Sequence, residues 1–195
     1  MRAWGSGIRA ARVAPALVLA ALLGSAPPCA GAPGADRSAT APELVLVGQG
    51  SYTWFGLAVY DAAYREAQPG CELRELTITY ARDVPARKLV KATREQWEKL
   101  GLDNRERTRP WLRELLDIWP DIKRGDYLSM RVDAAGVAQF SGVQGRLGAI
   151  SDPDFAPAFL SIWLHPDTSD RDLREDLLRG GSVCRLRPLE ELAGD

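Results

Sequence analysis

Residues 126–150 read DYLSMRVDAAGVAQFSGVQGRLGAI and contain three short segments with strand character. The predicted strands cover residues 126–133, 137–141 and 146–150. The sequences between them, Asp133-Ala134-Ala135-Gly136 and Gly142-Val143-Gln144-Gly145, both end in glycine, which favours tight turns. Strands that are joined by such short turns run antiparallel. This stretch therefore predicts a three-stranded antiparallel meander.

Two helices are predicted upstream of the meander. The first covers residues 85–100 and has Pro85 in its first turn, where a missing backbone N–H is tolerated. The second begins at a capping box formed by Asp103 and Glu106, and it stops at Pro120.

Two further helices are predicted downstream of it. Asp152 caps the first of them, with Pro153 at the first helical position. The second begins at Ser169 or Asp170. A short final strand is expected over residues 183–186.

The segment before the first helix is predicted to form three strands, over residues 43–48, 51–64 and 73–81. The segment 51–64 has apolar residues on both faces, so we expect a central strand that is covered on both sides. Gly56 in its middle is typical of a bulge or of a close approach by another group. The order of strands, two helices, strands and two helices predicts an α+β fold, with helices packed against an antiparallel sheet.

The first 32 residues have the three parts of a secretory signal peptide. Three arginines flank an apolar run over residues 13–23, and small residues at 30 and 32 fit a cleavage site. The apolar run is about half the length of a membrane span, which needs roughly 20 residues. An uncleaved anchor or a buried helix is the alternative. We expect cleavage near Ala32 and a periplasmic location.

The rest of the chain is then divided into three parts. A disordered leader is expected over residues 33–42, a single domain over 43–187 and a tail over 188–195. No stretch after the signal is long and apolar enough to span a membrane.

The composition is that of an ordinary globular protein. The 195 residues include 25 basic and 26 acidic side chains, and the loss of residues 1–32 would leave 22 basic and 26 acidic ones, a net charge of −4. At the level of net charge, nothing calls for nucleic acid or for an anionic membrane surface as a partner.

Two cysteines, Cys71 and Cys184, remain after the expected cleavage. An oxidising compartment and an even number of cysteines permit a disulfide between them, which would close a loop of more than a hundred residues. Two free, buried thiols are the alternative, because the sequence does not show that the two residues lie close together.

Most catalytic constellations are missing from the sequence. His165 is the single histidine, which excludes a metal site built from several histidines. Gly48-Gln49-Gly50 precedes a strand rather than a helix and is therefore not a dinucleotide-binding fingerprint. We expect no cofactor. The many tryptophans and tyrosines fit either the lining of an apolar cleft or a plain hydrophobic core.

Four motifs resemble exported bacterial chalcone isomerase-like proteins. They are Gly48-Gln49-Gly50 leading into WFGLAVYDA (54–62), YARDVP (80–85), WEKLG (97–101) and FAPAFLSIWL (155–164). The resemblance extends from Leu44 to Leu178. It implies an open-faced β-sandwich, in which a large antiparallel sheet carries helices on one face and a ligand cleft lies between them. Plant enzymes of this fold cyclise chalcones to flavanones, whereas related non-catalytic members bind fatty acids.

The resemblance also implies positions for a ligand site. The family's arginine, which holds an anionic oxygen, aligns with Tyr52, and a tyrosine carries no positive charge. Tyr80 matches the tyrosine at the end of a later strand, Ala92 replaces a cleft-facing asparagine, and Ser161 matches the hydroxyl residue of a late helix. The ligand-binding candidates are Tyr52, Trp54, Tyr80, Trp97 and Ser161.

The missing arginine favours a non-catalytic periplasmic binding protein for a small apolar or amphipathic ligand, similar to a fatty acid or a polyphenol. One alternative is an isomerase, an intramolecular lyase that uses the hydroxyl groups of Tyr52, Tyr80 and Ser161 as hydrogen-bond donors. The other is a structural, partner-binding protein without a ligand, in which Trp54 and Trp97 fill the cleft. No motif identifies the ligand, a protein partner or the oligomeric state.

Overall fold

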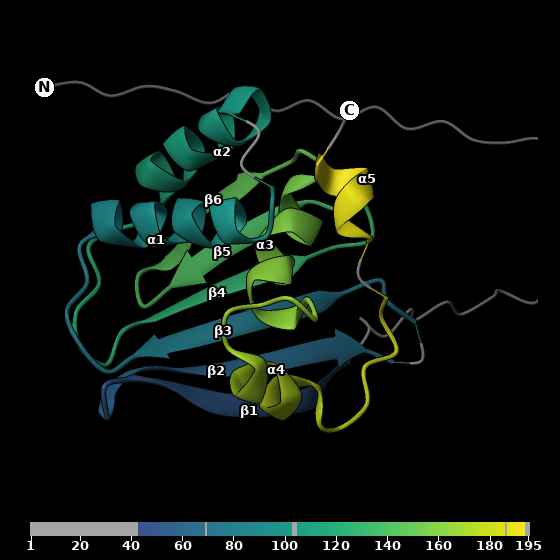
Figure 1. Cartoon of the computed structure of the whole chain (residues 1–195), viewed down its shortest axis with the longest axis horizontal. Coiled ribbons are helices and arrows are strands. Elements are labelled where there is room, and N and C mark those ends of the chain that lie inside the picture. Colours follow the sequence, from purple (N-terminus) through teal and green to yellow (C-terminus); the bar gives the residue numbers. More distant parts are fainter. Residues whose placement is uncertain (1–42, 69, 103–104, 186, 194–195) are drawn as a thin grey trace, which may run out of the picture. The chain divides into compact units, whose positions relative to one another are not determined.

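The computed structural model describes residues 43–68, 70–102, 105–185 and 187–193. Six antiparallel strands form one sheet, in which every strand lies beside its neighbours in sequence (Figure 1). The strands are β1 (Leu44–Trp54), β2 (Leu57–Ala67), β3 (Arg74–Tyr80), β4 (Tyr127–Val132), β5 (Ala138–Gly142) and β6 (Gly145–Ile150). The helices are α1 (Ala86–Lys99), α2 (Arg105–Ile118), α3 (Phe155–Leu164), α4 (Arg171–Leu178) and α5 (Leu189–Ala193).

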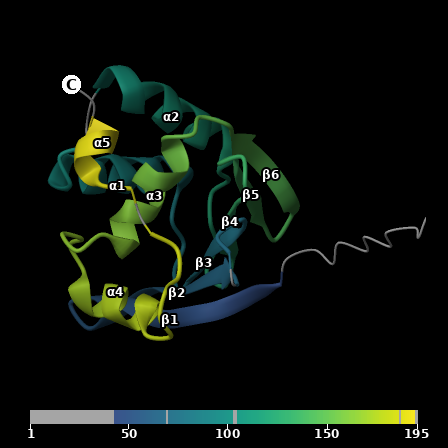
Figure 2. The ribbon, with the colours of Figure 1, turned by 90° about the vertical axis from the view of Figure 1, so that its right-hand side faces the viewer.

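The predicted α+β class is confirmed, and so is the antiparallel meander, which forms β4, β5 and β6. The helices lie on one side of the sheet (Figure 2). The opposite side carries polar contacts, such as the one between the hydroxyl groups of Thr77 and Ser129 at 3.2 Å and the ion pair of Arg131 with Glu75 at 2.7 Å. The sheet is therefore open to solvent on one face only.

The predicted single strand over residues 51–64 is wrong, because the chain reverses in its middle. Trp54 pairs with Leu57, so the loop between β1 and β2 contains only Phe55 and Gly56. Their φ angles of 49° and 74° are both positive, as a type I′ turn requires. Gly56 is therefore a turn residue, not a bulge, and the two apolar faces belong to two strands. Asparagine is usual at the position of Phe55, so the sequence did not signal this turn.

Helix α1 begins where the carboxylate of Asp121 accepts a hydrogen bond from the backbone N–H of Ala86, at 2.8 Å. Its buried residues include Leu89, Thr93 and Trp97, which share one helix face. Trp97 packs edge-to-face against Trp111 and against Phe155 of α3. An aromatic cluster thus joins three helices at one end of the core.

Helix α3 begins two residues later than predicted, with Asp154 rather than Asp152 as its N-cap. The carboxylate of Asp152 accepts instead from the backbone N–H of Asp154 at 3.0 Å and from Nε1 of Trp111 at 2.9 Å. Asp152 therefore connects the start of α3 to α2. Asp170 does cap α4, since its carboxylate accepts from the backbone N–H of Leu173 at 3.0 Å.

Helix α4 lies directly on β1 because two residues of that strand have no side chain. A Cβ atom at Gly48 would overlap the carbonyl oxygen of Asp176. One at Gly50 would lie 2.8 Å from the Cβ of Asp176 and 2.9 Å from a methyl carbon of Leu173. The backbone N–H of Gly180 donates to the carbonyl of Val47 at 2.8 Å, which fixes the end of the helix to the same strand.

The C-terminal segment returns to the far end of β2. Cys71 and Cys184 form a disulfide, with a Cα–Cα distance of 5.5 Å. The buried carboxylate of Glu66 accepts hydrogen bonds from the hydroxyl of Ser182 and from the backbone N–H of Val183 at 2.9 Å. The disulfide and this carboxylate hold the segment that follows α4 against the sheet.

The last residues of the chain differ from the expected final strand and tail. The described residues 183–185 form no strand, and residues 189–193 form α5, in which Leu192 is buried. The expected signal peptide (1–32), the leader (33–42) and Asp103 of the expected capping box lie outside the described residues. In the described ranges, no helix has the length and apolar character needed to cross a bilayer.

We predict that Gly48→Ala lowers the free energy of unfolding by about 2 kcal/mol or more, because the added methyl group displaces α4 from β1. Urea denaturation followed by circular dichroism measures the change. Gln49→Ala is the matched control, because Gln49 is an exposed neighbour in the same strand. Equal stabilities of the two variants would contradict the account.

Candidate functional site

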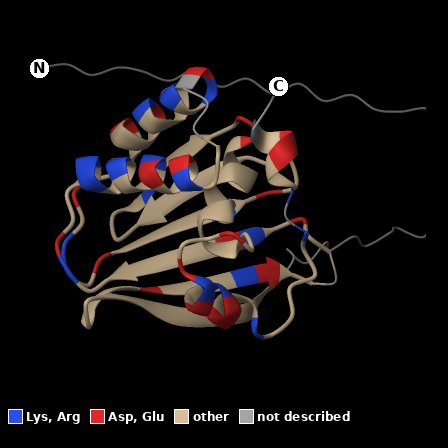
Figure 3. Cartoon of the chain, viewed as in Figure 1, with Lys and Arg blue, Asp and Glu red and all other residues tan. Residues whose placement is uncertain are grey.

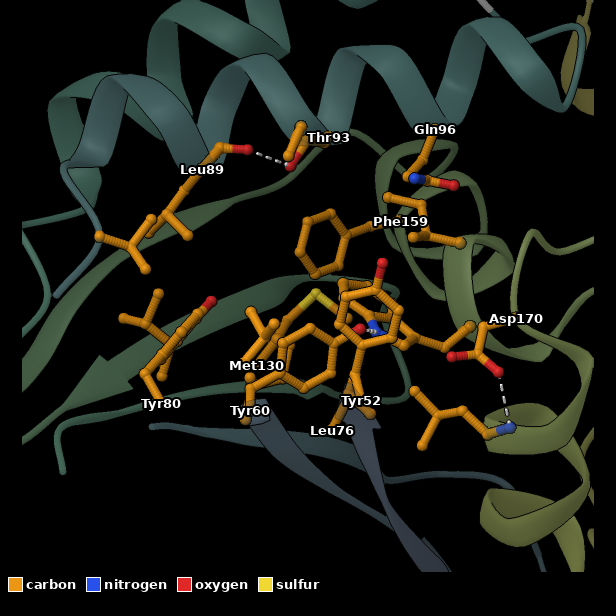
Figure 4. Close-up of a pocket in the computed structure, with 18 of the residues that line it drawn as sticks. Tyr52, Tyr60, Leu76, Tyr80, Leu89, Thr93, Gln96, Met130, Phe159 and Asp170 are labelled. Atoms are coloured by element: carbon orange, nitrogen blue, oxygen red, sulfur yellow. Dashed lines mark hydrogen bonds between the residues drawn. The ribbon is translucent and has the colours of Figure 1, made fainter. Parts of the chain in front are cut away.

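A cavity of about 270 Å³ lies between the inner face of the sheet and the helices α1, α3 and α4 (Figure 4). Small-molecule sites commonly measure about 300–1,000 Å³, so this space suits a small ligand. Its apolar lining includes Val59, Leu76, Ile78, Val84, Leu89, Ala92, Leu128, Met130, Phe140, Phe159, Ile162 and Leu173. Its polar or amphipathic lining comprises Tyr52, Tyr60, Tyr80, Lys88, Thr93, Gln96, Trp119, Trp163, Thr168, Ser169 and Asp170.

The periodicity of the elements directs these side chains inward. On β3, Leu76, Ile78 and Tyr80 alternate with residues that face the solvent side of the sheet. On α1, residues 88–89, 92–93 and 96 recur at helical spacing and form one face above the cavity. Strand and helix thus form the two opposite walls.

Three tyrosines form a row across three neighbouring strands. Tyr52 of β1 pairs in register with Tyr60 of β2, and Tyr60 pairs with Tyr80 of β3. The rings of Tyr52 and Tyr60 stack at 5.1 Å, and those of Tyr60 and Tyr80 meet edge-to-face at 6.1 Å (Figure 4). The hydroxyl of Tyr60 accepts a hydrogen bond from Nε1 of Trp163 at 3.1 Å, so its own proton is available to a ligand.

Burial raises the pKa of Tyr60 and of Tyr80 well above the ordinary tyrosine value, because the phenolate form loses its hydration. For Tyr60 the hydrogen bond from Trp163 only partly opposes this shift in pKa. Both side chains are therefore neutral phenols near neutral pH. They offer hydrogen-bond donors to a bound molecule and are poor general bases.

A further donor of the cavity wall has no partner. Trp119 lines the cavity, and its buried Nε1 donates to no acceptor within the described residues. A buried donor that is left unpaired costs about 1–3 kcal/mol. An acceptor atom on a bound molecule would remove this penalty, so the cavity favours ligands that carry a carbonyl, carboxylate or phenolic oxygen.

The charged side chains of the cavity lie at its rim. Lys88 is exposed on α1, and Asp170 is half-buried at the start of α4. Between them, the hydroxyl of Ser169 donates to the side-chain oxygen of Gln96 at 2.7 Å and connects the two helices. Since no other charged residue lines the cavity, its interior suits an apolar body and its rim suits a polar end.

Of the predicted ligand-binding candidates, Tyr52 and Tyr80 line the cavity, while the others lie outside its lining. Trp54 precedes the β1–β2 turn and is 56% exposed. Trp97 is fully buried and donates from Nε1 to the carbonyl of Ala158 at 2.8 Å. The hydroxyl of Ser161 donates to the same carbonyl at 2.7 Å. Trp97 and Ser161 thus belong to the contact between α1 and α3.

The sequence analysis missed several residues of the site. Tyr60 was not predicted as a site residue because one continuous strand was predicted over residues 51–64. A single strand gave no reason to expect that Tyr60 pairs with Tyr52. Asp170 was predicted only as a helix cap. Lys88 and Gln96 had no motif of their own, although the helical spacing of Lys88, Ala92 and Gln96 places them on one face.

No group of three His, Cys, Asp or Glu side chains that could hold a metal ion occurs within the described ranges.

Comparisons with known proteins agree with this fold. The sequence profile of the chalcone isomerase-like family matches residues 36–179. Among solved structures, a fatty-acid binding protein of Arabidopsis thaliana matches with a TM-score of 0.57 and 12% sequence identity, over 69% of this chain and 86% of that one. No curated protein sequence matches this chain. At this low identity, the structural match supports the fold alone.

We predict that the protein loses stability steeply above pH 10, the ordinary tyrosine value, because burial raises the pKa of Tyr60, Tyr64 and Tyr80. Below that pH both states keep these protons. Above it the unfolded chain releases protons that the folded chain retains, so the free energy of unfolding falls by roughly 1.4 kcal/mol per pH unit for each tyrosine.

Tyrosinate absorbance and circular dichroism, recorded in one alkaline titration, check this prediction. Ionisation of the buried tyrosines should coincide with unfolding. Ionisation of all five tyrosines of the chain while the fold persists would contradict it.

We also predict that Tyr80→Phe weakens the binding of a ligand with an oxygen acceptor roughly three- to tenfold. Stability should change by less than about 1 kcal/mol, because the Tyr80 hydroxyl has no partner among the described residues. Tyr127→Phe is the control, since Tyr127 is exposed outside the cavity. Titration calorimetry measures the ligand affinity of both variants. Equal affinities would exclude Tyr80 as a hydrogen-bond donor to the ligand.

Proposed function

The chain belongs to the chalcone isomerase-like family, and on this premise we propose that it is an exported, non-catalytic binding protein that holds a small apolar or amphipathic molecule in its cavity. The observation that carries the proposal is the cavity itself, an apolar space between sheet and helices whose buried polar groups are neutral donors. The signal-like residues 1–32 and the disulfide support export to the periplasm.

The ligand class follows from the positions of polar groups around the cavity. The interior accepts an apolar chain or ring system, and Tyr60, Tyr80 and Trp119 offer donors to oxygen acceptors. Lys88 at the rim is placed to meet a carboxylate that projects towards solvent. A fatty acid or a polyphenol combines these features, and the fold shared with the Arabidopsis fatty-acid binding protein supports the first of them.

Three observations favour binding over an isomerase reaction. Ser161, one of the three donors that an isomerase would use, lies outside the cavity lining. Tyr80 is held as a neutral phenol, which removes it as a base near neutral pH. The position of the family's anion-holding arginine is taken by Tyr52, so the cavity interior has no cation to stabilise a phenolate.

The test is to close the mouth of the cavity without disturbing the core. Ala92 is an exposed residue of α1 that lines the cavity, so the indole of Ala92→Trp is expected to fill the entrance. Lys99→Trp places the same side chain on an exposed position of the same helix, outside the cavity lining. Titration calorimetry with saturated fatty acids of increasing chain length, and with a chalcone and a flavanone, compares the two variants after delipidation.

We predict that the unsubstituted protein and Lys99→Trp bind one of these ligands and that Ala92→Trp binds it at least tenfold more weakly, a difference of about 1.4 kcal/mol. Failure of all three proteins to bind any of the ligands would contradict the proposal. Turnover of the chalcone above the uncatalysed rate would replace it with the isomerase alternative.

A further inference from the structure

The tip of the β1–β2 hairpin is apolar and exposed. Phe55 is 87% exposed, Leu57 is 57% exposed and Trp54 is 56% exposed. Phe55 lies in the two-residue loop and Trp54 and Leu57 flank it, and the ring centroids of Trp54 and Phe55 are 4.9 Å apart. Three large apolar side chains thus occupy a narrow, convex end of the molecule.

The backbone conformation of Phe55 is unfavourable for the stability of the turn. Its φ angle of 49° lies in the left-handed region, where a bulky residue is an outlier. Asparagine is favoured at this place in a type I′ turn. The phenylalanine therefore destabilises the turn while it exposes an aromatic ring, and this combination points to a role at the surface.

Basic residues lie at the same end of the sheet as the tip, on the side towards α1 (Figure 3). The backbone N–H of Ala81 donates to the carbonyl of Val59, and that of Gly125 donates to the carbonyl of Tyr80. These bonds place residues 81–83 and 123–125 beside the hairpin end of the sheet. The start of α1 lies at the same end, and Figure 3 shows the basic residues there. The cations of this end are Arg82, Arg87, Lys88, Lys123 and Arg124.

Acidic residues at this end accept hydrogen bonds from backbone N–H groups of neighbouring loops. The carboxylate of Asp83 accepts from the N–H of Arg124 at 2.9 Å, and that of Asp126 accepts from the N–H of Lys123 at 2.8 Å. Asp121 binds the first N–H of α1. Of the five cations, Lys123 alone pairs with an acid among the described residues, at 3.4 Å from Asp83. The five cations outnumber the four acids at this end, Asp61, Asp83, Asp121 and Asp126, so the surface beside the tip carries a small positive excess, although the whole chain does not.

We propose that this tip, Trp54 to Leu57 with the cations at the same end of the sheet, docks the protein on the surface of an anionic lipid bilayer. Apolar side chains that enter the interface and cations that meet the phosphate groups are the two contributions on which such binding depends. Tryptophan is also favoured at the boundary between headgroups and acyl chains.

A bilayer fits the shape of this surface better than a protein partner does. A stable protein interface buries roughly 800 Å² on each partner, which three side chains on a convex turn do not supply. A fluid interface accepts a narrow apolar tip without a complementary pocket. The tip is also close to the cavity, because Val59 lines the cavity two residues after Leu57. The inference does not depend on what the cavity holds.

Phe55→Asn separates this role from folding. Asparagine relieves the left-handed strain, so the variant should melt roughly 2–5 °C higher than the unsubstituted protein. Its affinity for vesicles of phosphatidylcholine and phosphatidylglycerol should fall roughly tenfold, because one large apolar side chain no longer enters the interface. Val183→Ser is the control, since Val183 is exposed at the opposite end of the sheet.

Arg124→Gln tests the electrostatic part in the same vesicle assay. It should weaken binding to vesicles with phosphatidylglycerol but not to vesicles of phosphatidylcholine alone, and added salt should reduce the difference. Arg185→Gln is the control, because Arg185 is exposed beside the disulfide, far from the tip.

The emission of Trp54 reports on the tip itself. The spectrum of the unsubstituted protein minus that of Trp54→Phe should shift to the blue on vesicles and be quenched by brominated lipids. An unchanged Trp54 spectrum, or equal vesicle affinity of Phe55→Asn and Val183→Ser, would overturn the proposal. So would a concentration-dependent dimer that Phe55→Asn abolishes, because the tip would then bind a second copy of the chain.

Discussion

The close contact between α4 and β1 is the constraint on which the candidate site depends. Gly48 and Gly50 remove two side chains from the strand, and the helix occupies the space. The residues at the start of this helix, Asp170 and Leu173, then form one wall of the cavity. Helix α1 covers the cavity from the side opposite the sheet, and the hydroxyl of Ser169 connects it to the start of α4 at the rim. The two glycines therefore shape a site that they do not touch.

The cavity combines an apolar interior with donors that have lost their contact with water. A row of tyrosines crosses three strands, and burial raises the pKa of two of these phenols above the ordinary tyrosine value. The buried Nε1 of Trp119, a lining residue, adds a donor that has no acceptor among the described residues. Such an arrangement recognises oxygen acceptors on an apolar body, while the charged residues of the lining, Lys88 and Asp170, lie at its rim. This chemistry is the basis on which we propose binding.

The sequence predicts those parts of the fold that local periodicity determines. The β4–β6 meander, α1 and the capped start of α4 follow from turn glycines, helical spacing and Asp170. The β1–β2 hairpin was missed, because Phe55 occupies a turn position that normally signals itself by asparagine. For the same reason the pairing of Tyr52 with Tyr60 was not predicted. Trp97 and Ser161 face the α1–α3 contact, which only tertiary packing decides.

The central claim is that the space between sheet and helices holds a small organic molecule. Native mass spectrometry of the protein, purified without delipidation, tests this claim most directly when Ala92→Trp is measured beside it. The account predicts that the unsubstituted protein carries one small organic molecule that denaturation releases, and that Ala92→Trp carries none. Bare protein in both samples, or the same bound mass in both, would contradict the account.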